Sequence, residues 1–185
     1  MSVNLLPPRR FVPQIGLNLG SGLDLKYGFI NLDISKDYLP DVISDLEQPL
    51  PFKSESFYFV YASHILEHIR NYYQLIQEIW RVLKMDGIFV AVVPHAYSRA
   101  AIADPSHVRL FVPESFFHLS DTFLGPISAP SIWGLFQIID IHEIPHDYEV
   151  DGPVRGSYFT EIYCEMKKIP KATPPKIVSS KEATE

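Results

Sequence analysis

The stretch from Ile15 to Asp33 contains the residues best suited to hold a ligand. An apolar run over 15–19 predicts a buried strand, and Gly20-Ser21-Gly22 follows it at once. Two glycines one residue apart allow a sharp backbone turn and a close approach of a ligand to the main chain. A second apolar run over 29–32 then ends on the carboxylate of Asp33. Such a carboxylate can accept hydrogen bonds from ribose hydroxyls, so the stretch has the layout of an α/β nucleoside site.

Two simpler interpretations of these residues stay open. The third glycine of a G-x-G-x-x-G fingerprint is absent, because Gly28 comes too late and belongs to the next turn. A plain hairpin is an alternative explanation of Gly20 and Gly22. Asp33 could also be a solvated carboxylate at the end of a strand.

The elements that must position these residues are short strands with one clear helix. Apolar runs predict strands over 15–19, 29–32, 41–44, 57–61 and 88–93. Between the last two, Asn71 with Gln74 has capping-box spacing, and Gly87 supplies a stop. The apolar stripe of this helix is Leu75, Ile76, Ile79, Trp80 and Leu83. Strand 88–93 is apolar on both faces, as in the middle of a parallel sheet.

The second half of the chain is less regular. Residues 113–123 predict a helix with Pro113 in its first turn. Residues 135–144 and 158–166 predict two antiparallel strands joined by a polar loop. Aromatic side chains over 111–136 could line an acceptor pocket or belong to the core: Phe111, Phe116, Phe117, Phe123, Trp133 and Phe136.

Composition limits the class of protein. The 185 residues fit an N-terminal arm (1–14), one folded domain (15–168) and a disordered tail (169–185). A net charge of −6 argues against a general nucleic-acid binder. We find no apolar stretch long enough to span a membrane and no signal peptide, so a cytoplasmic protein is expected. The lone Cys164 excludes an internal disulfide and a thiol metal cluster.

Five segments in this order resemble a class I S-adenosylmethionine-dependent methyltransferase, in the small branch known only as a methyltransferase domain. They are Leu17-Asn-Leu-Gly-Ser-Gly22, Asn31-Leu-Asp33, Asp45-Leu46 before Leu50-Pro-Phe52, Ser63-His-Ile-Leu-Glu-His-Ile69, and the helix-Gly87-strand-Pro94 block. The resemblance implies an α/β fold with a Rossmann-like, mostly parallel seven-strand sheet whose last strand is antiparallel. It covers roughly residues 15 to 168.

The resemblance also implies a cofactor, S-adenosyl-L-methionine, and a set of residues that bind it. Gly20 and Gly22 would lie under its methionine and ribose, and Asp33 would bind the ribose hydroxyls. Asp45 would reach the adenine amino group, unless it only forms a turn. The expected cofactor-binding set is Leu19, Gly20, Ser21, Gly22, Asp33, Ile34, Asp45, Leu46, Ser63 and His64, the last two facing the methionine end.

The chain departs from this family in its first two crossovers. Only six residues separate Gly22 from Phe29 and only eight separate Asp33 from Val42, where relatives have helices. A parallel crossover normally takes a dozen or more residues. We therefore expect reduced helices after the first two strands, and one face of that half of the sheet without its cover. The N-terminal arm or a second subunit, in a homodimer, would cover it.

Three histidines could act on a methyl acceptor, since an oxygen acceptor usually needs a base. They are His64, His95 and His107, the last within an Asp-Pro-x-His-x-Arg stretch seen in relatives. His107 is the first choice as base, and the alternative is a loop histidine bonded to the backbone. Arg109 could hold an anionic substrate group or, as we favour, pair with Asp104.

The segment His64-Ile-Leu-Glu67-His68 also matches the H-x-x-E-H motif of zinc peptidases. On a helix, two histidines at i and i+4 could bind zinc with Glu67 as base. No third ligand is evident in the sequence, so we predict no metal. Glu67 and His68 would then only begin a helix.

We therefore expect transfer of a methyl group to an oxygen or nitrogen of a small-molecule or sugar-type acceptor. The acceptor class is chosen by elimination, with no nucleic-acid or membrane partner. A non-catalytic S-adenosylmethionine or nucleotide-binding module is the alternative, and an H-x-x-E-H zinc hydrolase a more remote one. A nicotinamide-binding protein is disfavoured by the missing third glycine.

Overall fold

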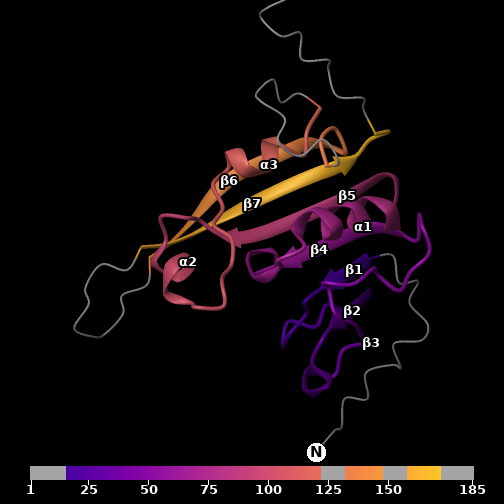
Figure 1. Ribbon diagram of the computed structural model, residues 1–185, viewed down its shortest axis with the longest axis horizontal. Coiled ribbons are helices and arrows are strands. Elements are labelled where there is room, and N and C mark those ends of the chain that lie inside the picture. The colour runs from indigo at the N-terminus through magenta and orange to yellow at the C-terminus, as the bar shows by residue number, and fades with distance from the viewer. Residues whose placement is uncertain (1–15, 122–131, 148–157, 172–185) are drawn as a thin grey trace, which may run out of the picture.

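The computed structural model describes residues 16–121, 132–147 and 158–171, and its centre is a seven-stranded sheet (Figure 1). The spatial order is β3-β2-β1-β4-β5-β7-β6. The strands are β1 (Gly16–Leu19), β2 (Phe29–Asp33), β3 (Val42–Ile43), β4 (Phe57–Ser63), β5 (Leu83–Pro94), β6 (Phe136–Asp147) and β7 (Tyr158–Lys168). The first five strands in this order, β3-β2-β1-β4-β5, pair in parallel, whereas β7 is antiparallel to both of its neighbours, β5 and β6. The predicted fold class is therefore confirmed.

One helix supplies most of the cover of this sheet. Helix α1 (Tyr72–Val82) packs on β5, and its side chains Leu75, Ile76 and Ile79 are at most 1% exposed. They belong to the same hydrophobic core as fully buried strand residues such as Val60 and Phe89, so apolar side chains of both the helix and the sheet form this core. The other described helices are short: α2 (Arg99–Ala103), α3 (Glu114–Phe117), and the 3₁₀ turns η2 (Lys36–Tyr38) and η3 (Leu66–His68). None of the described helices is long and apolar enough to cross a bilayer.

The ends of α1 differ from the prediction. The Asn71 side chain makes no capping bond; instead the Glu47 carboxylate accepts the backbone N–H groups of Arg70 and Asn71, at 2.7 and 2.9 Å. The helix stops at Val82, and Gly87 lies inside β5. Leu83 already pairs with β4, so pairing within the sheet ends the helix before the glycine is reached.

The two short crossovers contain no α-helix, as predicted. Residues 20–28 join β1 to parallel β2 through turns, and residues 34–41 join β2 to β3 with only the 3₁₀ turn η2. In Figure 1 the indigo strands β1 to β3 have no helix beside them. The cover expected from the N-terminal arm falls on residues outside the described ranges.

A buried network of two asparagines takes the place of the missing helices. Asn18 and Asn31 are register partners on β1 and β2, at most 2% exposed, and their side chains bond at 3.0 Å. Asn18 also donates to the Asp24 carbonyl, and Asn31 accepts from the Lys26 N–H, both at 2.8 Å. The Asp41 carboxylate accepts from the backbone and the side chain of Asn31 at 2.8 and 2.9 Å. The network thus satisfies backbone groups of the first crossover and ties the end of the second to the sheet.

The aromatic side chains of the second half belong mostly to the core. Phe111, Phe116, Trp133 and Phe136 are at most 5% exposed, whereas Phe117 is half-buried. Phe123 lies outside the described residues. The helix predicted over 113–123 is the shorter α3, Glu114–Phe117. After α3, Ser120 forms an isolated bridge with Phe136, the first residue of β6.

Candidate active site

The predicted cofactor residues meet at one edge of the sheet. In the parallel register Leu19 lies beside Leu32 of β2 and beside Ala62 of β4. Asp33 lies beside Ile43 of β3. The segments that follow these strands therefore share the carboxyl edge, where open α/β folds bind their ligands.

The glycine turn is held by the strand next to it. The Ser21 N–H donates to the Leu32 carbonyl at 3.0 Å, and the Gly22 N–H donates to Asp33 Oδ2 at 2.8 Å. Gly20 and Gly22 have φ of 60° and 48°, the left-handed region that favours glycine. A Cβ on Gly22 would meet nothing within 4 Å, so there is open space above this residue.

An unpartnered polar atom lies in the same turn. Ser21 Oγ is buried and has no hydrogen-bond partner within the described part of the chain. A buried hydroxyl normally finds a partner, because leaving it without one costs free energy. A polar ligand over the glycine turn would supply that partner.

Asp33 is suited to a diol. Its side chain is 7% exposed, and each carboxylate oxygen accepts one backbone N–H, Oδ2 from Gly22 and Oδ1 from Ser35 at 2.8 Å. These two bonds fix the orientation of the carboxylate and leave lone pairs on both oxygens. Ile34 follows it with 67% of its surface exposed, so an apolar surface lies next to the carboxylate.

A backbone hydrogen bond holds the loop that carries Asp45 and Leu46 close to Asp33. The Ser44 N–H donates to the Asp33 carbonyl at 3.0 Å, which brings the loop after β3 to the same edge. Asp45 Oδ1 accepts the Glu47 N–H at 2.9 Å, the local bond of a turn-forming aspartate. The Leu46 side chain is 7% exposed and enters the core.

Helix α1 fixes the loop that follows. Glu78 accepts the Leu50 N–H at 2.8 Å and binds Arg81 at 2.7 Å, and Arg81 donates to the Phe52 carbonyl at 2.7 Å. The hydrogen bonds with Arg81, ahead of the one from Leu50, lower the pKa of Glu78. The clamp holds the loop after Asp45 against the sheet.

His64 stands at the end of β4 between two carboxylates. Its Nε2 lies 2.5 Å from Glu161 Oε1, and its Nδ1 lies 3.5 Å from Glu67 Oε1. Contact with Glu67, and then with Glu161, raises the pKa of His64. The residue has φ of 51°, so the chain turns sharply here, next to half-buried Ser63. Sequence reasoning missed Glu161, since it comes from β7, 97 residues away, and no local pattern marks it.

His107 offers a free ring nitrogen. Its Nδ1 lies 2.9 Å from the Ala101 carbonyl, which can only accept, so the proton of the neutral ring is on Nδ1. Nε2 therefore keeps its lone pair, 3.8 Å from Asp104 Oδ2, on a side chain that is 9% exposed. This arrangement suits a base.

His95 is arranged the other way. The Tyr97 N–H donates to its Nδ1 at 3.1 Å, so the proton of the neutral ring is on Nε2, 3.8 Å from Glu143. The residue is 6% exposed, and its backbone N–H donates to the Thr160 carbonyl. In this geometry it would donate a proton before it could accept one.

The H-x-x-E-H segment does not form the helix that its zinc reading requires. Residues 66–68 are a single 3₁₀ turn, which places the i and i+4 histidines differently from an α-helix. His64 turns to Glu161, whereas His68 Nδ1 lies 3.1 Å from Ser106 Oγ. The remote zinc alternative therefore lacks the α-helical histidine pair that it needs.

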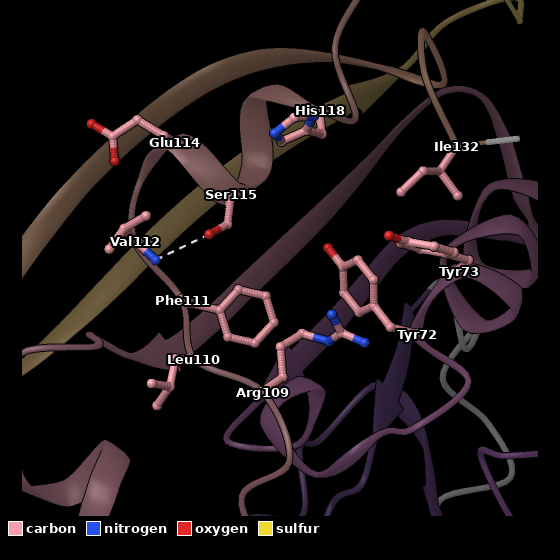
Figure 2. A pocket seen from close by; sticks show the side chains of 10 residues that line it. All are labelled: Tyr72, Tyr73, Arg109, Leu110, Phe111, Val112, Glu114, Ser115, His118 and Ile132. Carbon is pink, nitrogen blue, oxygen red and sulfur yellow. Dashed lines mark hydrogen bonds between the residues drawn. The ribbon is translucent and has the colours of Figure 1, made fainter. Parts of the chain in front are cut away.

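A pocket of about 290 Å³ lies beside this edge, between α1 and the chain leading into α3 (Figure 2). The Arg109 guanidinium lies over the Tyr72 ring, 4.6 Å from its centre. The favoured pairing of Arg109 with Asp104 is wrong: Asp104 accepts from the backbone and hydroxyl of Ser106. Arg109 Nε and the Tyr72 hydroxyl are buried without a hydrogen-bond partner among the residues described. No residue of the glycine turn lines the pocket, so the two are separate. Arg109 Nε and the Tyr72 hydroxyl could each form a hydrogen bond with a ligand.

Comparisons with known proteins agree with this geometry. A family model described as a methyltransferase domain matches residues 19–91, from the end of β1 into β5. This span contains the glycine turn, Asp33, Asp45 and His64. No curated protein sequence matches the chain.

Solved structures with the same fold come from several organisms. A protein from Bacillus halodurans C-125 assigned as a methyltransferase is 16% identical, with a TM-score of 0.63 over 84% of this chain and 92% of that one. A complex of the Haloferax volcanii Trm112 methyltransferase activator with a methyltransferase contains a chain that is 14% identical, with a TM-score of 0.60 over 88% of this chain and 85% of that one. An S-adenosylmethionine-dependent methyltransferase from Archaeoglobus fulgidus is 17% identical, with a TM-score of 0.56 over 86% of this chain and 90% of that one. At these identities the structures establish the fold. The chain therefore has the fold of S-adenosylmethionine-dependent methyltransferases, and its residues 19–91 match a methyltransferase domain.

Proposed function

We propose that the chain transfers the methyl group of S-adenosylmethionine to an oxygen or nitrogen of a small-molecule or sugar-type acceptor, with the cofactor bound along the edge formed by β1 to β4. The observation that carries the proposal is the bond from the Gly22 N–H to Asp33 Oδ2 at 2.8 Å. It joins the turn that leaves open space to the carboxylate that can hold a ribose.

The first half of the proposed cofactor site is the glycine turn. Leu19, Gly20 and Gly22 let the ligand approach the main chain, and Ser21 Oγ is a polar atom that lacks a partner. Asp33 accepts the ribose hydroxyls with the lone pairs that its two backbone bonds leave.

The second half is the adenine end. The exposed Ile34 side chain offers an apolar contact to the base, with the Leu46 backbone on the loop opposite. Asp45 Oδ1 accepts the Glu47 N–H within the turn. Asp45 Oδ2 takes no part in that bond, so it can accept a hydrogen bond from the adenine amino group. Ser63 and His64 lie at the methionine end.

Bound S-adenosylmethionine supplies a methyl group that its sulfonium already activates. The task of this chain is therefore to align an acceptor and to take its proton. His107 is our first choice as base because Nε2 is its unprotonated nitrogen. His64 Nε2 is bonded to Glu161 and His95 Nδ1 accepts from the Tyr97 N–H, so neither of these nitrogens is open to an acceptor.

The pocket beside the edge supports a small polar acceptor. Its aromatic wall includes Tyr72 and Tyr73, and Arg109 brings a positive charge with an unbonded Nε. A sugar or an aromatic acid bound there would stack on the rings and supply the missing partner. The net charge of −6 also disfavours a nucleic-acid acceptor.

The test is calorimetry of the full chain with S-adenosylmethionine, S-adenosylhomocysteine and NAD. We expect binding of the first two, and D33N should weaken it at least about tenfold through loss of a charged acceptor. D37N is the matched control, since Asp37 is an exposed aspartate of the next turn. Tight binding of NAD in place of the sulfonium would contradict the proposal. Cofactor binding without turnover of any acceptor, including whatever co-purifies, would favour a non-catalytic module.

A further inference from the structure

Three side chains of metal-binding type converge beside the sheet edge. One ligand atom from each of Glu67, His68 and His107 lies within 4.8 Å of the other two. Glu67 and His68 belong to η3 after β4, whereas His107 comes from the segment between α2 and α3. The cluster therefore joins two loops that are about 40 residues apart in the chain.

Glu67 is the reason to expect a cation there. Its side chain is 1% exposed, and neither carboxylate oxygen has a hydrogen-bond partner in the described ranges. His64 Nδ1 lies 3.5 Å from Glu67 Oε1, which is an ion-pair distance but too long for a good hydrogen bond. A buried carboxylate without hydrogen bonds is unfavourable, and a bound metal ion would give its oxygens the direct bonds that the contact with His64 does not.

The two histidines already hold their rings as metal ligands do. His107 donates from Nδ1 to the Ala101 carbonyl at 2.9 Å. The hydroxyl of Ser106 gives its single proton to Asp104, at 2.5 Å, so it accepts from His68 Nδ1–H at 3.1 Å. Both rings therefore keep the Nε2 lone pair free. Outer hydrogen bonds of this kind fix the tautomer and the ring plane of metal-binding histidines.

We propose that Glu67, His68 Nε2 and His107 Nε2 bind one divalent transition-metal ion of the zinc class. Two histidines and one carboxylate are a donor set that zinc and iron(II) favour, with at least one position left open. Ligands about 2.0–2.2 Å from zinc lie about 3.4 Å apart in a tetrahedron, so side-chain shifts of about 1 Å would close the site.

His107 belongs to both the metal site and the proposed function, in which it is the base. When His107 binds an ion, its Nε2 is no longer a base, and the ion itself can lower the pKa of an acceptor oxygen in the open position. Metal binding is measured without cofactor or acceptor. Failure of the metal site therefore leaves methyl transfer standing, and absence of methyl transfer leaves the metal site standing.

The experiment is titration of the full chain, stripped with a chelator, by Zn²⁺ in a calorimeter and by Co²⁺ with visible absorption as the readout. We expect one ion per chain and a Co²⁺ d–d band. Elemental analysis of the protein as purified distinguishes zinc from iron. A folded wild-type chain that binds neither ion would overturn the proposal.

Variants test the ligand set. E67Q, H68Q and H107Q should each weaken binding at least about 100-fold, and S106A about tenfold through the ring of His68. H142Q is the matched control, because His142 is half exposed on β6 and pairs with Asp140. Binding that H107Q leaves unchanged, or that H64Q abolishes, would assign the ion to the His64/His68 motif and contradict this site. Circular dichroism of each variant confirms folding, and S106A gives a surface change that tests the site even where E67Q does not fold.

Discussion

At the scale of single residues, Gly20 and Gly22 have similar backbone angles but different reasons to be glycine. Both have positive φ, at 60° and 48°. A Cβ on Gly20 would lie 2.5 Å from Ile65, whereas a Cβ on Gly22 would meet nothing within 4 Å. Gly20 is therefore required by packing, whereas Gly22 borders open space, where we propose that the cofactor lies.

This difference predicts different effects of the two alanine substitutions on stability and on cofactor binding. G20A combines strain with a clash and should lower the free energy of unfolding by about 2–4 kcal/mol. G22A adds only backbone strain, about 1–2 kcal/mol, but should weaken S-adenosylmethionine binding at least about tenfold. Urea unfolding and calorimetry measure the two quantities separately. Equal losses of stability, with cofactor binding by G22A intact, would contradict the assignment.

At the scale of elements, side-chain hydrogen bonds hold the first two crossovers against the sheet, where relatives have crossover helices. Asn18 and Asn31 join β1 to β2 and bond to both short crossovers. A parallel pair with so short a connection leaves backbone groups that no crossover helix satisfies. The asparagines supply those partners from inside the sheet.

The network predicts a large cost for removing one asparagine. N31L keeps the approximate shape but removes the side-chain bonds of Asn31 to Asn18, to the Lys26 N–H and to the Asp41 carboxylate. We expect a loss of about 2–4 kcal/mol in the free energy of unfolding, since buried unsatisfied groups carry most of such costs.

The control for this substitution is N71L. Asn71 is exposed and its side chain makes no capping bond. Its replacement should change stability by no more than about 0.5 kcal/mol, in contrast to a typical N-cap. Chemical denaturation of both variants provides the comparison, and equal effects would remove the special role of Asn31.

At the scale of the whole molecule, the helix-poor half exposes apolar side chains. Those at least 61% exposed around β1 to β3 are Leu23, Tyr27, Ile34, Leu39 and Ile43. Contiguous apolar surface is uncommon on monomers. We keep the proposal that the N-terminal arm or a second copy of the chain covers this half.

Light scattering of the full chain and of a chain lacking residues 1–13 tests this cover. We expect a dimer in at least one of the two, because either the arm or a partner must shield the surface. If the arm provides the cover, the dimer forms only after truncation. A well-folded monomer in both samples would remove the idea.

Local patterns in the sequence were enough to predict the order of the strands and which strand ends lie at one edge of the sheet. The glycine pair, Asp33 at the end of β2 and the apolar runs that make the strands are all short-range signals. Parallel register then brings strand ends together, so the predicted residues meet at one edge. The absence of crossover helices followed from counting residues between Gly22 and Phe29.

Other predictions failed where a long-range contact outweighed a local preference. Asn71 has the right type for a cap, but the Glu47 carboxylate takes the backbone groups nearby. Gly87 could end a helix, but pairing of Leu83 with β4 ends it earlier. Arg109 had Asp104 within reach along the chain, yet it lies over Tyr72.

The sequence by itself determined the class of fold and which strand ends share the carboxyl edge of the sheet, because the hydrophobic period, the turn residues and the strand ends are set by neighbouring residues. Only the tertiary structure decided which histidine keeps a free nitrogen, that Glu161 reaches His64, and that Glu67, His68 and His107 converge. These facts depend on which loops the sheet brings side by side, and such proximity comes from packing between segments far apart in the chain.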